Sequence, residues 1–292
     1  MPRLIKSAGA ITAALAGLLT LNSTVAPPAS ATQTVGTTAE YVALGDSYAS
    51  GAGLLGKIDT ACDRSDRGYP AVLARSLKPA VHRNVTCSGA TTAQLTTAQG
   101  GNPAQLTALS AKTTLVTLTI GGNDIGFSGI LTTCVVTGVS NPTGSPCRAY
   151  YKGGGTDQLA ARTAATQPKI AAALTAIKQR SPKAKVVVVG YPSIVPDDGA
   201  KCRPSLPLAD GDVGYLRDVT KKFNAMLAST AAAANVTYAD TYTPTVGRDM
   251  CRSAATRFIE PLTTTAAAPA HPNALGQFVM ALPVVDLFTR SS

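Results

Sequence analysis

The sequence predicts an α/β fold, a sandwich of parallel strands and helices joined by right-handed crossovers. The first observation is that short apolar segments alternate along the chain with longer helical ones. The second is that residues 115–120 and 186–189 are almost entirely apolar or β-branched. Such runs are typical of strands buried on both faces of a parallel sheet. The third is the spacing of Ile170, Leu174 and Ile177, which places three apolar side chains on one helical face.

The predicted elements follow one another in an order that suits parallel crossovers. Strands are predicted at residues 41–44, 84–87, 114–120, 185–189 and 236–239. Helices are predicted at residues 69–77, 157–179, 212–234 and 274–289. Two segments rich in glycine, proline, threonine and serine, residues 137–155 and 190–214, are predicted to be long loops that each carry a cysteine. Residues 32–39 are expected to form a flexible leader.

The first residues have the pattern of a secretory signal peptide. Arg3 and Lys6 form a basic start, an apolar stretch follows, and small residues up to Ala31 offer a cleavage site. The apolar stretch is short for a membrane span, and no later segment is a candidate for one. We therefore expect residues 1–31 to be removed, which leaves residues 32–292 as a single domain of a secreted protein.

The chain is basic, with a formal net charge of +10 at pH 7. Its positive residues form modest clusters within residues 64–83 and 178–185. Solvated helix faces explain such clusters, and attraction to anionic lipid is the sharper alternative. Transient contact with lipid surfaces is therefore expected at most. Nucleic acid is not expected as a partner, because the basic residues are not interleaved with aromatic ones and the chain is expected to be exported.

Six cysteines in an exported chain indicate disulfide bonds. The sequence permits several pairings, of which the sequential one is the simplest: Cys62–Cys87, Cys134–Cys147 and Cys202–Cys251. A structural zinc site is the alternative, but the chain has no CxxC pair and only two histidines. P-loop and HExxH motifs are missing from the sequence too. Neither a metal nor a cofactor is therefore expected.

Ser47 follows the first predicted strand directly, in the sequence Gly45-Asp46-Ser47-Tyr48. A strand that breaks at a glycine and then presents a serine places the hydroxyl at the carboxyl edge of a sheet, where ligand crevices of α/β folds lie. A helix N-cap is the structural alternative for this serine. Polar segments also follow the next two strands, so all three are expected at one crevice.

A serine needs a base to become a nucleophile, and the chain offers two histidines. His82 comes just before a predicted strand, away from any carboxyl edge, and is expected to be a surface residue. His271 lies in a short Pro-Ala-His-Pro segment near the end of the chain. His271 is therefore the predicted base for Ser47.

An ester attacked by a serine develops negative charge on its carbonyl oxygen, which needs hydrogen-bond donors. The predicted donors are the backbone N–H groups of Ser47 and Gly89 and the side-chain amide of Asn123. Asp46 and Asp124 stand beside two of these residues, and they are expected to cap helices or order turns.

The segment after the predicted amide donor is unusually apolar for a loop. It contains Ile125, Phe127, Ile130 and Leu131. Core packing and an acyl pocket explain these residues equally well, so both interpretations stay open.

Together these blocks resemble the GDSL (SGNH) hydrolase superfamily, and more narrowly its secreted bacterial lipases and esterases with three disulfides. Ser47, Gly89, Asn123 and His271 stand at the family's four positions, in the family's order. The resemblance spans about residues 40–290. It implies a flavodoxin-like three-layer α/β/α sandwich with a five-stranded parallel sheet, hydrolysis of carboxylic esters without a cofactor, and sequential disulfides.

The chain departs from the family pattern at Ala268, three residues before the histidine, where the family usually has an aspartate. That aspartate would fix the imidazole tautomer and stabilise the imidazolium. Some similar secreted proteins lack the acid and use a main-chain carbonyl. We therefore expect a Ser47–His271 dyad in which the carbonyl of Ala268, or of a close neighbour, accepts the Nδ1–H. A distant Asp240 or Asp249 is the alternative acid.

The predicted function is hydrolysis of lipid esters or small acyl esters by a secreted, monomeric serine esterase or lipase. Phospholipase A action on anionic phospholipids is the main alternative, and the basic charge suggests it. An inactive surface-binding module on the same fold is an alternative of another class, favoured only by the missing acid at position 268. Carbohydrate deacetylation is a weaker option, because the chain has no tryptophan to stack on sugars.

Overall fold

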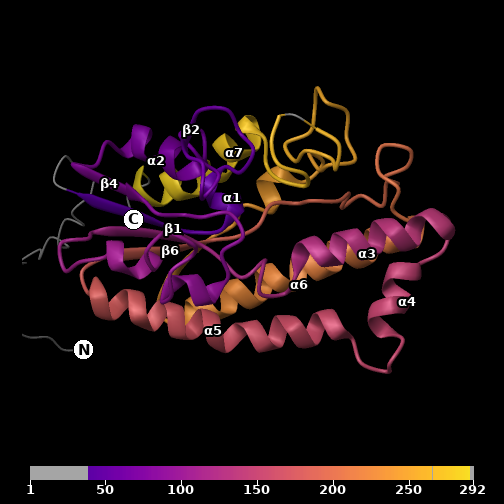
Figure 1. The fold of residues 1–292 in the computed structure, drawn as a ribbon, viewed down its shortest axis with the longest axis horizontal. Coiled ribbons are helices and arrows are strands. Elements are labelled where there is room, and N and C mark those ends of the chain that lie inside the picture. The colour runs from indigo at the N-terminus through magenta and orange to yellow at the C-terminus, as the bar shows by residue number, and fades with distance from the viewer. Residues whose placement is uncertain (1–38, 265, 290–292) are drawn as a thin grey trace, which may run out of the picture. The chain divides into compact units, whose positions relative to one another are not determined.

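The computed structural model describes residues 39–264 and 266–289, and a five-stranded parallel sheet lies at its centre (Figure 1). The strands are β1 (Glu40–Gly45), β4 (Val81–Asn84), β5 (Leu115–Thr119), β6 (Lys185–Val189) and β7 (Thr237–Ala239). Their order across the sheet is β4-β1-β5-β6-β7, with every neighbouring pair parallel. This is the flavodoxin-like order. The strand order reverses between β1 and β5, and ligands in such sheets bind outside the carboxyl ends of those strands.

Helices cover both faces of the sheet, which confirms the three-layer sandwich. The long helices are α2 (Tyr69–Leu77), α5 (Gln158–Arg180), α6 (Asp210–Ala233) and α7 (Ala274–Thr289). Val42 and Leu44 of β1 belong to the core that includes α5 and α6, whereas Tyr41 and Ala43 belong to the core that includes α2 and α7. Side chains along a strand alternate between the two faces. The apolar run in β1 follows from this, because each face of the sheet has its own core.

The strand predicted at residues 84–87 is wrong in its position, since β4 spans Val81–Asn84. β4 is an edge strand whose His82 and Arg83 are exposed, so its sequence lacks an apolar pattern. The segment after β4 keeps contact with the sheet, because the Cys87 N–H donates to the Gly45 carbonyl of β1.

The long loop predicted at residues 137–155 is also wrong, because two helices occupy much of it. They are α3 (Phe127–Ser140) and α4 (Pro146–Lys152). α3 is rich in threonine, valine and glycine, which are weak helix formers. Its helix is stabilised by packing: Ile130 and Cys134 are buried on one face.

Short elements complete the described part of the chain. They are α1 (Ser47–Ser50), β2 (Lys57–Asp59), β3 (Arg64–Ser65) and the 3₁₀ turns η1 (Thr92–Leu95), η2 (Gln105–Ala108) and η3 (Thr243–Thr245). The loop predicted at residues 190–214 is free of helices and strands until α6 begins at Asp210, slightly earlier than predicted.

Three disulfides join the cysteines in sequential pairs: Cys62–Cys87, Cys134–Cys147 and Cys202–Cys251. This is the simplest pairing, and the one that the family resemblance implies. The second bond joins α3 to α4.

The predicted signal peptide, residues 1–31, lies outside the described residues. Within residues 39–264 and 266–289, no helix has the length and apolar character that crossing a membrane requires.

Candidate active site

Ser47 lies where β1 ends and the one-turn helix α1 begins. The junction needs a glycine at position 45, which has a φ of +150°. A Cβ on Gly45 would lie 2.5 Å from the carbonyl oxygen of Thr119 on the neighbouring strand. The cap of α1 is Asp46, whose carboxylate accepts the Tyr48 N–H at 3.0 Å. Since Asp46 takes the capping role, the Ser47 hydroxyl is available for another partner.

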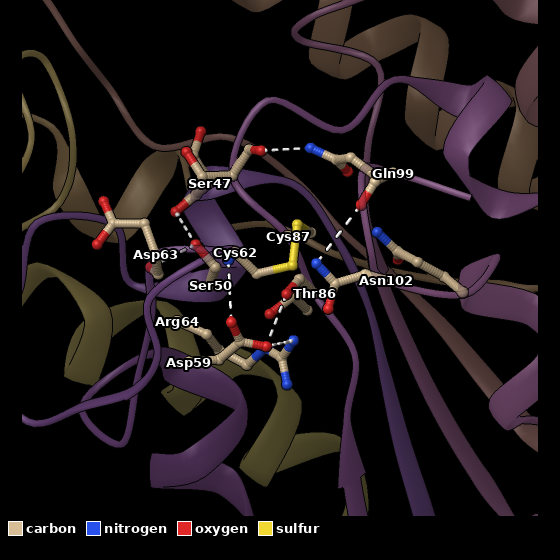
Figure 2. The surroundings of a disulfide bond; sticks show 12 residues. Ser47, Ser50, Asp59, Cys62, Asp63, Arg64, Thr86, Cys87, Gln99 and Asn102 are labelled. Atoms are coloured by element: carbon tan, nitrogen blue, oxygen red, sulfur yellow. Dashed lines mark hydrogen bonds and ion pairs between the residues drawn. A yellow bond between two sulfur atoms is a disulfide. The ribbon is translucent and has the colours of Figure 1, made fainter. Parts of the chain in front are cut away.

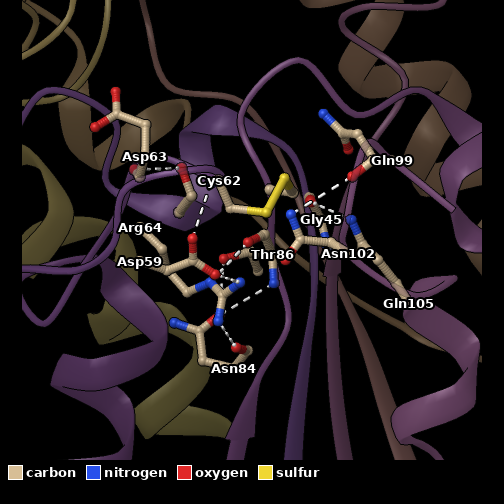
Figure 3. A network of polar contacts seen from close by, with 12 residues as sticks. Gly45, Asp59, Cys62, Asp63, Arg64, Asn84, Thr86, Gln99, Asn102 and Gln105 are labelled. Carbon is tan, nitrogen blue, oxygen red and sulfur yellow. Dashed lines mark hydrogen bonds and ion pairs between the residues drawn. A yellow bond between two sulfur atoms is a disulfide. The ribbon is translucent and has the colours of Figure 1, made fainter.

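A buried glutamine holds the end of β1 (Figure 3). The Gln105 side chain accepts the Gly45 N–H at 2.7 Å and donates to the Gly45 carbonyl at 2.9 Å. The same carbonyl also accepts the Cys87 N–H, so the Cys62–Cys87 disulfide is anchored to this strand end. The surroundings of this disulfide, drawn in Figure 2, include Ser47. Side chains and a covalent bond thus fix the backbone that presents the serine.

His271 reaches Ser47 from the far end of the chain. Its Nε2 lies 2.7 Å from Ser47 Oγ, and its Nδ1 lies 2.7 Å from the carbonyl oxygen of Pro269. A proton on Nδ1 directed at that carbonyl leaves Nε2 as an acceptor for the serine proton. The acceptor is thus Pro269, one residue after the expected Ala268. The Ala268 carbonyl instead accepts the backbone N–H of His271 at 3.1 Å, and this bond closes a tight turn in which Ala270 has a φ of +61°.

Backbone contacts support the loop that carries His271. The Ala268 N–H donates to the Ala52 carbonyl at 3.0 Å. Gly53, with a φ of +77°, lies so close that a Cβ there would overlap the Ala268 nitrogen. The Gly53 N–H in turn donates to the Asp63 carboxylate at 2.9 Å. The histidine loop therefore rests on residues 52–53, which rest on Asp63.

Glu260 supports the other side of the histidine loop. Its backbone N–H donates to the His271 carbonyl at 2.9 Å, and its carbonyl accepts the Ala270 N–H at 3.0 Å. The Glu260 carboxylate is nearly fully buried and accepts hydrogen bonds from the side chains of Arg257, Thr264 and Asn273. The histidine backbone is thus held between Glu260 and the segment at residues 52–53.

Burial lowers the pKa of His271 from its ordinary value of 6.5, whereas the Pro269 carbonyl and the Asp63 carboxylate both act to raise it. A lowered pKa keeps the imidazole neutral in mildly acidic solution. The neutral form is the one that can accept a proton from a serine.

The three predicted oxyanion donors lie in different environments. The Ser47 N–H is the first of α1, and it has no acceptor among the described residues. Asn123 lines the same cavity as Ser47 and His271. One N–H of its amide donates to the Ala90 carbonyl at 2.8 Å, which leaves the second for a ligand. Gly89 is exposed, has a φ of +79°, and comes directly before Ala90.

Asp46 and Asp124 have structural contacts, as expected. Asp124 accepts hydrogen bonds from both the N–H and the hydroxyl of Thr92, so it ties the segment around Asn123 to η1. Burial raises the pKa of Asp46 to about 7, although the hydrogen bond from Tyr191 lowers it.

Two tyrosines beside the Ser47–His271 pair were not predicted from the sequence. The Tyr191 hydroxyl donates to the Asp46 carboxylate at 2.5 Å and accepts the Gly122 N–H at 2.9 Å. The Tyr48 ring lies against the His271 imidazole, with centroids 4.7 Å apart. The only sequence signals were their places, directly after Ser47 and just past the carboxyl end of β6.

An apolar groove, called here the first groove, opens beside Ser47 and His271. The predicted acyl-pocket residues Ile125, Phe127, Ile130 and Leu131 all line it. Its other wall, which the sequence did not reveal, consists of Tyr191, Ile194, Leu216, Val219 and Phe223. Together with its mouth, which is open to solvent, the groove comprises about 710 Å³ of space.

Three residues considered as alternatives make their contacts elsewhere. His82 lies on β4 and stacks on Tyr41, with ring centroids 4.9 Å apart. The Asp240 carboxylate accepts hydrogen bonds at the start of η3. The Asp249 carboxylate pairs with Arg252 at 3.0 Å.

A parallel α/β sheet that brings a serine, a glycine, an asparagine and a histidine to its carboxyl edge defines the class of SGNH hydrolases. The chain belongs to the GDSL-like lipase/acylhydrolase family, whose model matches residues 43–278. It is therefore a carboxylic ester hydrolase.

Individual relatives agree with this assignment. Lipase 2 of Streptomyces coelicolor is 40% identical over 284 residues, which cover 94% of this chain and 95% of that protein. The crystal structure of an extracellular lipase from Streptomyces rimosus superposes with a TM-score of 0.71 at 32% identity, covering 86% of this chain and 100% of that one. A phospholipase A1 from Streptomyces albidoflavus superposes with a TM-score of 0.70 at 29% identity, with the same coverage.

Proposed function

We propose that this chain is an exported serine esterase or lipase in which Ser47 is the nucleophile and His271 the general base. The observation that carries the proposal is the pair of 2.7 Å contacts made by one imidazole, from Nε2 to Ser47 Oγ and from Nδ1 to the Pro269 carbonyl. The carbonyl takes the orienting role that an aspartate has in a triad, without its negative charge.

In the proposed reaction, Ser47 Oγ attacks the acyl carbon of the ester while His271 Nε2 takes the serine proton. The resulting oxyanion accepts hydrogen bonds from the N–H groups of Ser47 and Gly89 and from the free N–H of Asn123. As the C–O bond breaks, Nε2 returns the proton to the leaving alcohol. Water then repeats the attack with the same base, which releases the acid and restores the serine.

The acyl chain occupies the first groove in this proposal. Ser47 and Asn123 both line that groove, so a carbonyl held between them directs its acyl chain along the apolar wall. Ile125, Phe127, Ile130 and Leu131 are the proposed acyl-pocket residues.

The two histidines provide a matched test. We expect His271→Ala and Ser47→Ala each to lower kcat for a p-nitrophenyl ester by about 10⁴-fold or more, since members of such a unit fail together. We expect His82→Ala to keep its activity, because His82 stacks on Tyr41 on an edge strand. An organophosphonate should form a covalent adduct at Ser47. Retained hydrolysis by Ser47→Ala would contradict the proposal.

Phospholipase A action on anionic phospholipids is a second candidate. Its support is the 29% identity to a phospholipase A1 and the positive net charge, which stays positive when Arg3 and Lys6 are removed with the signal peptide. Hydrolysis of phosphatidylglycerol and of tributyrin, compared at low and high salt, distinguishes the two candidates. Preference for the anionic lipid that fades with salt favours the second.

We also propose that the protein is exported after cleavage near Ala31 and acts as a monomer. The basic and apolar start of the chain, its three disulfides and its similarity to an extracellular lipase support export. Amino-terminal sequencing of secreted protein tests the cleavage site, and sedimentation tests the monomer.

A further inference from the structure

A second groove meets the first one at His271. Phe127, Ser128, Leu131 and His271 line both. The second groove continues between α3, which contributes Thr132, Val135 and Val136, and the histidine loop, which contributes Leu262, Pro269 and Ala270. His271 thus lies where the two apolar grooves meet.

The two grooves differ in some of their lining residues, and this difference assigns them to different parts of the ester. Ser47 and Asn123 line the first groove, whereas the second has neither. A scissile carbonyl must lie against Ser47 Oγ and the oxyanion donors, so its acyl chain follows the first groove. The leaving oxygen must face His271 Nε2 to receive its proton, so its substituent is directed to the histidine side.

The chemistry of the second groove selects an aliphatic substituent. Apart from His271, none of its lining residues is ionisable, and the Thr132 hydroxyl is already bonded to the Ser128 carbonyl at 2.9 Å. The groove therefore offers no counter-ion for a charged head group. The Ser128 hydroxyl is a polar group that it shares with the first groove. Val136 is 64% exposed at its edge, so an occupant would cover apolar surface that otherwise faces water.

We propose that the second groove binds the alkyl portion of the leaving alcohol. The preferred substrates are then esters with apolar chains on both sides of the scissile bond. This inference rests on the proposed function of Ser47 and His271, and it adds selectivity on the alcohol side to that function.

The test compares two ester series. In one, hexanoate esters carry alcohols from ethanol to octanol; in the other, the acyl chain of p-nitrophenyl esters varies. Each added methylene on the alcohol should raise kcat/KM by about two- to fourfold until the groove is filled. Val136→Ser should reduce, by about threefold, the total increase in kcat/KM from the ethyl to the octyl ester. The ratios of kcat/KM between esters of different acyl chain length should stay within about twofold of those of the wild type.

The same helix supplies a matched control. Val139 is also 64% exposed on α3 but does not line the second groove. We expect Val139→Ser to keep the wild-type dependence on alcohol length. Leu262→Ser, on the opposite wall, should reproduce the effect of Val136→Ser.

The outcomes separate this inference from the proposed function. If Ser47 forms no phosphonate adduct and neither series is hydrolysed, the proposed function fails. If both series are hydrolysed but kcat/KM does not depend on alcohol length, only the alcohol groove is wrong. Equal behaviour of Val136→Ser and Val139→Ser would also overturn it.

Discussion

The two halves of the active site are built in different ways. Ser47 is presented by a strand end that side chains hold, with Gln105 on Gly45 and Tyr191 on Asp46. His271 is presented by a loop whose own supports are mainly backbone, at the Ala52 and Glu260 carbonyls. The serine side thus depends mainly on buried polar side chains, and the histidine side mainly on close approach of main chains. The Tyr48 hydroxyl adds one buried side-chain contact to the histidine side, since it donates to the Ala270 carbonyl at 2.7 Å.

The difference explains how the site does without a triad acid. Where the main chain already fixes the ring, a carbonyl at 2.7 Å can set the tautomer that an aspartate would set. The charge of an aspartate has no such substitute in direct contact. The more distant Asp63 supplies part of it, since its carboxylate acts to raise the pKa of His271.

Outside the Ser47–His271 pair itself, the largest effect is expected where the histidine loop meets its support. In Gly53→Ala, the new Cβ would overlap the Ala268 nitrogen and push the loop away from Ser47. Because misplacement of a reacting group by about 1 Å can cost about 10²-fold, we expect kcat to fall by about that factor. Steady-state kinetics with a p-nitrophenyl ester measures it.

Gly100→Ala is the matched control. Gly100 also has a positive φ, of +58°, but nothing lies within 4 Å of the position of its Cβ. We expect a loss of stability of about 1–2 kcal/mol there and little change in kcat. Equal losses of activity in both variants would mean that backbone strain lowers kcat, and that the contact between residue 53 and Ala268 does not determine the position of His271.

On the serine side, Tyr191→Phe removes a buried hydroxyl that serves both Asp46 and Gly122. Leaving these groups without their partner should cost about 1–3 kcal/mol in free energy of unfolding. The pKa of Asp46 is about 7 in the folded protein, so its carboxylate is mainly ionised only above that pH. The hydroxyl stabilises the ionised form.

The cost of Tyr191→Phe should therefore be greater at pH 9 than at pH 5. Urea denaturation at the two pH values measures this difference. A cost that does not depend on pH would show that the Asp46 hydrogen bond is unimportant and that the loss comes from the Gly122 N–H left without its acceptor.

The contrast between the two halves also decides what the sequence could reveal. The end of β1, with glycine, aspartate and serine in succession, is a local pattern, and Ser47 could be predicted from it. The atom that orients His271 could not, because it depends on a turn in which the non-glycine residue Ala270 adopts a positive φ. A sequence offers no signal for such a conformation.

The groove walls were only half predictable for a similar reason. Ile125 and Phe127 directly follow Asn123, so their position near the site could be inferred. α3 itself was missed, because its weak helix formers depend on tertiary packing, including the close approach of Gly138 to the Pro207 carbonyl. Leu216 and Val219 lie far along the chain, and only the packing of α6 brings them to the groove.

A smaller effect is expected from the charge near the histidine. Asp63→Asn keeps an acceptor for the Gly53 N–H but removes the charge that raises the pKa of His271. The acidic limb of kcat/KM should therefore move to lower pH. Lys57→Gln removes the cation that pairs with Asp63 at 2.7 Å, and should move the limb the other way. Shifts in the same direction would contradict an electrostatic role for Asp63.

The smallest effect is expected from restoring the family's acid, in Ala268→Asp. The Nδ1–H of His271 already donates to the Pro269 carbonyl, so it is not available to a new carboxylate. The Ala268 backbone is held by its hydrogen bond to Ala52, so the carboxylate cannot move to displace that carbonyl. We expect kcat to stay within about threefold, as for an exposed charge. Ala266→Asp adds the same charge at an exposed position of the same loop and serves as control. A tenfold gain in Ala268→Asp alone would mean that the carboxylate displaces the carbonyl, and that the backbone acceptor limits the rate.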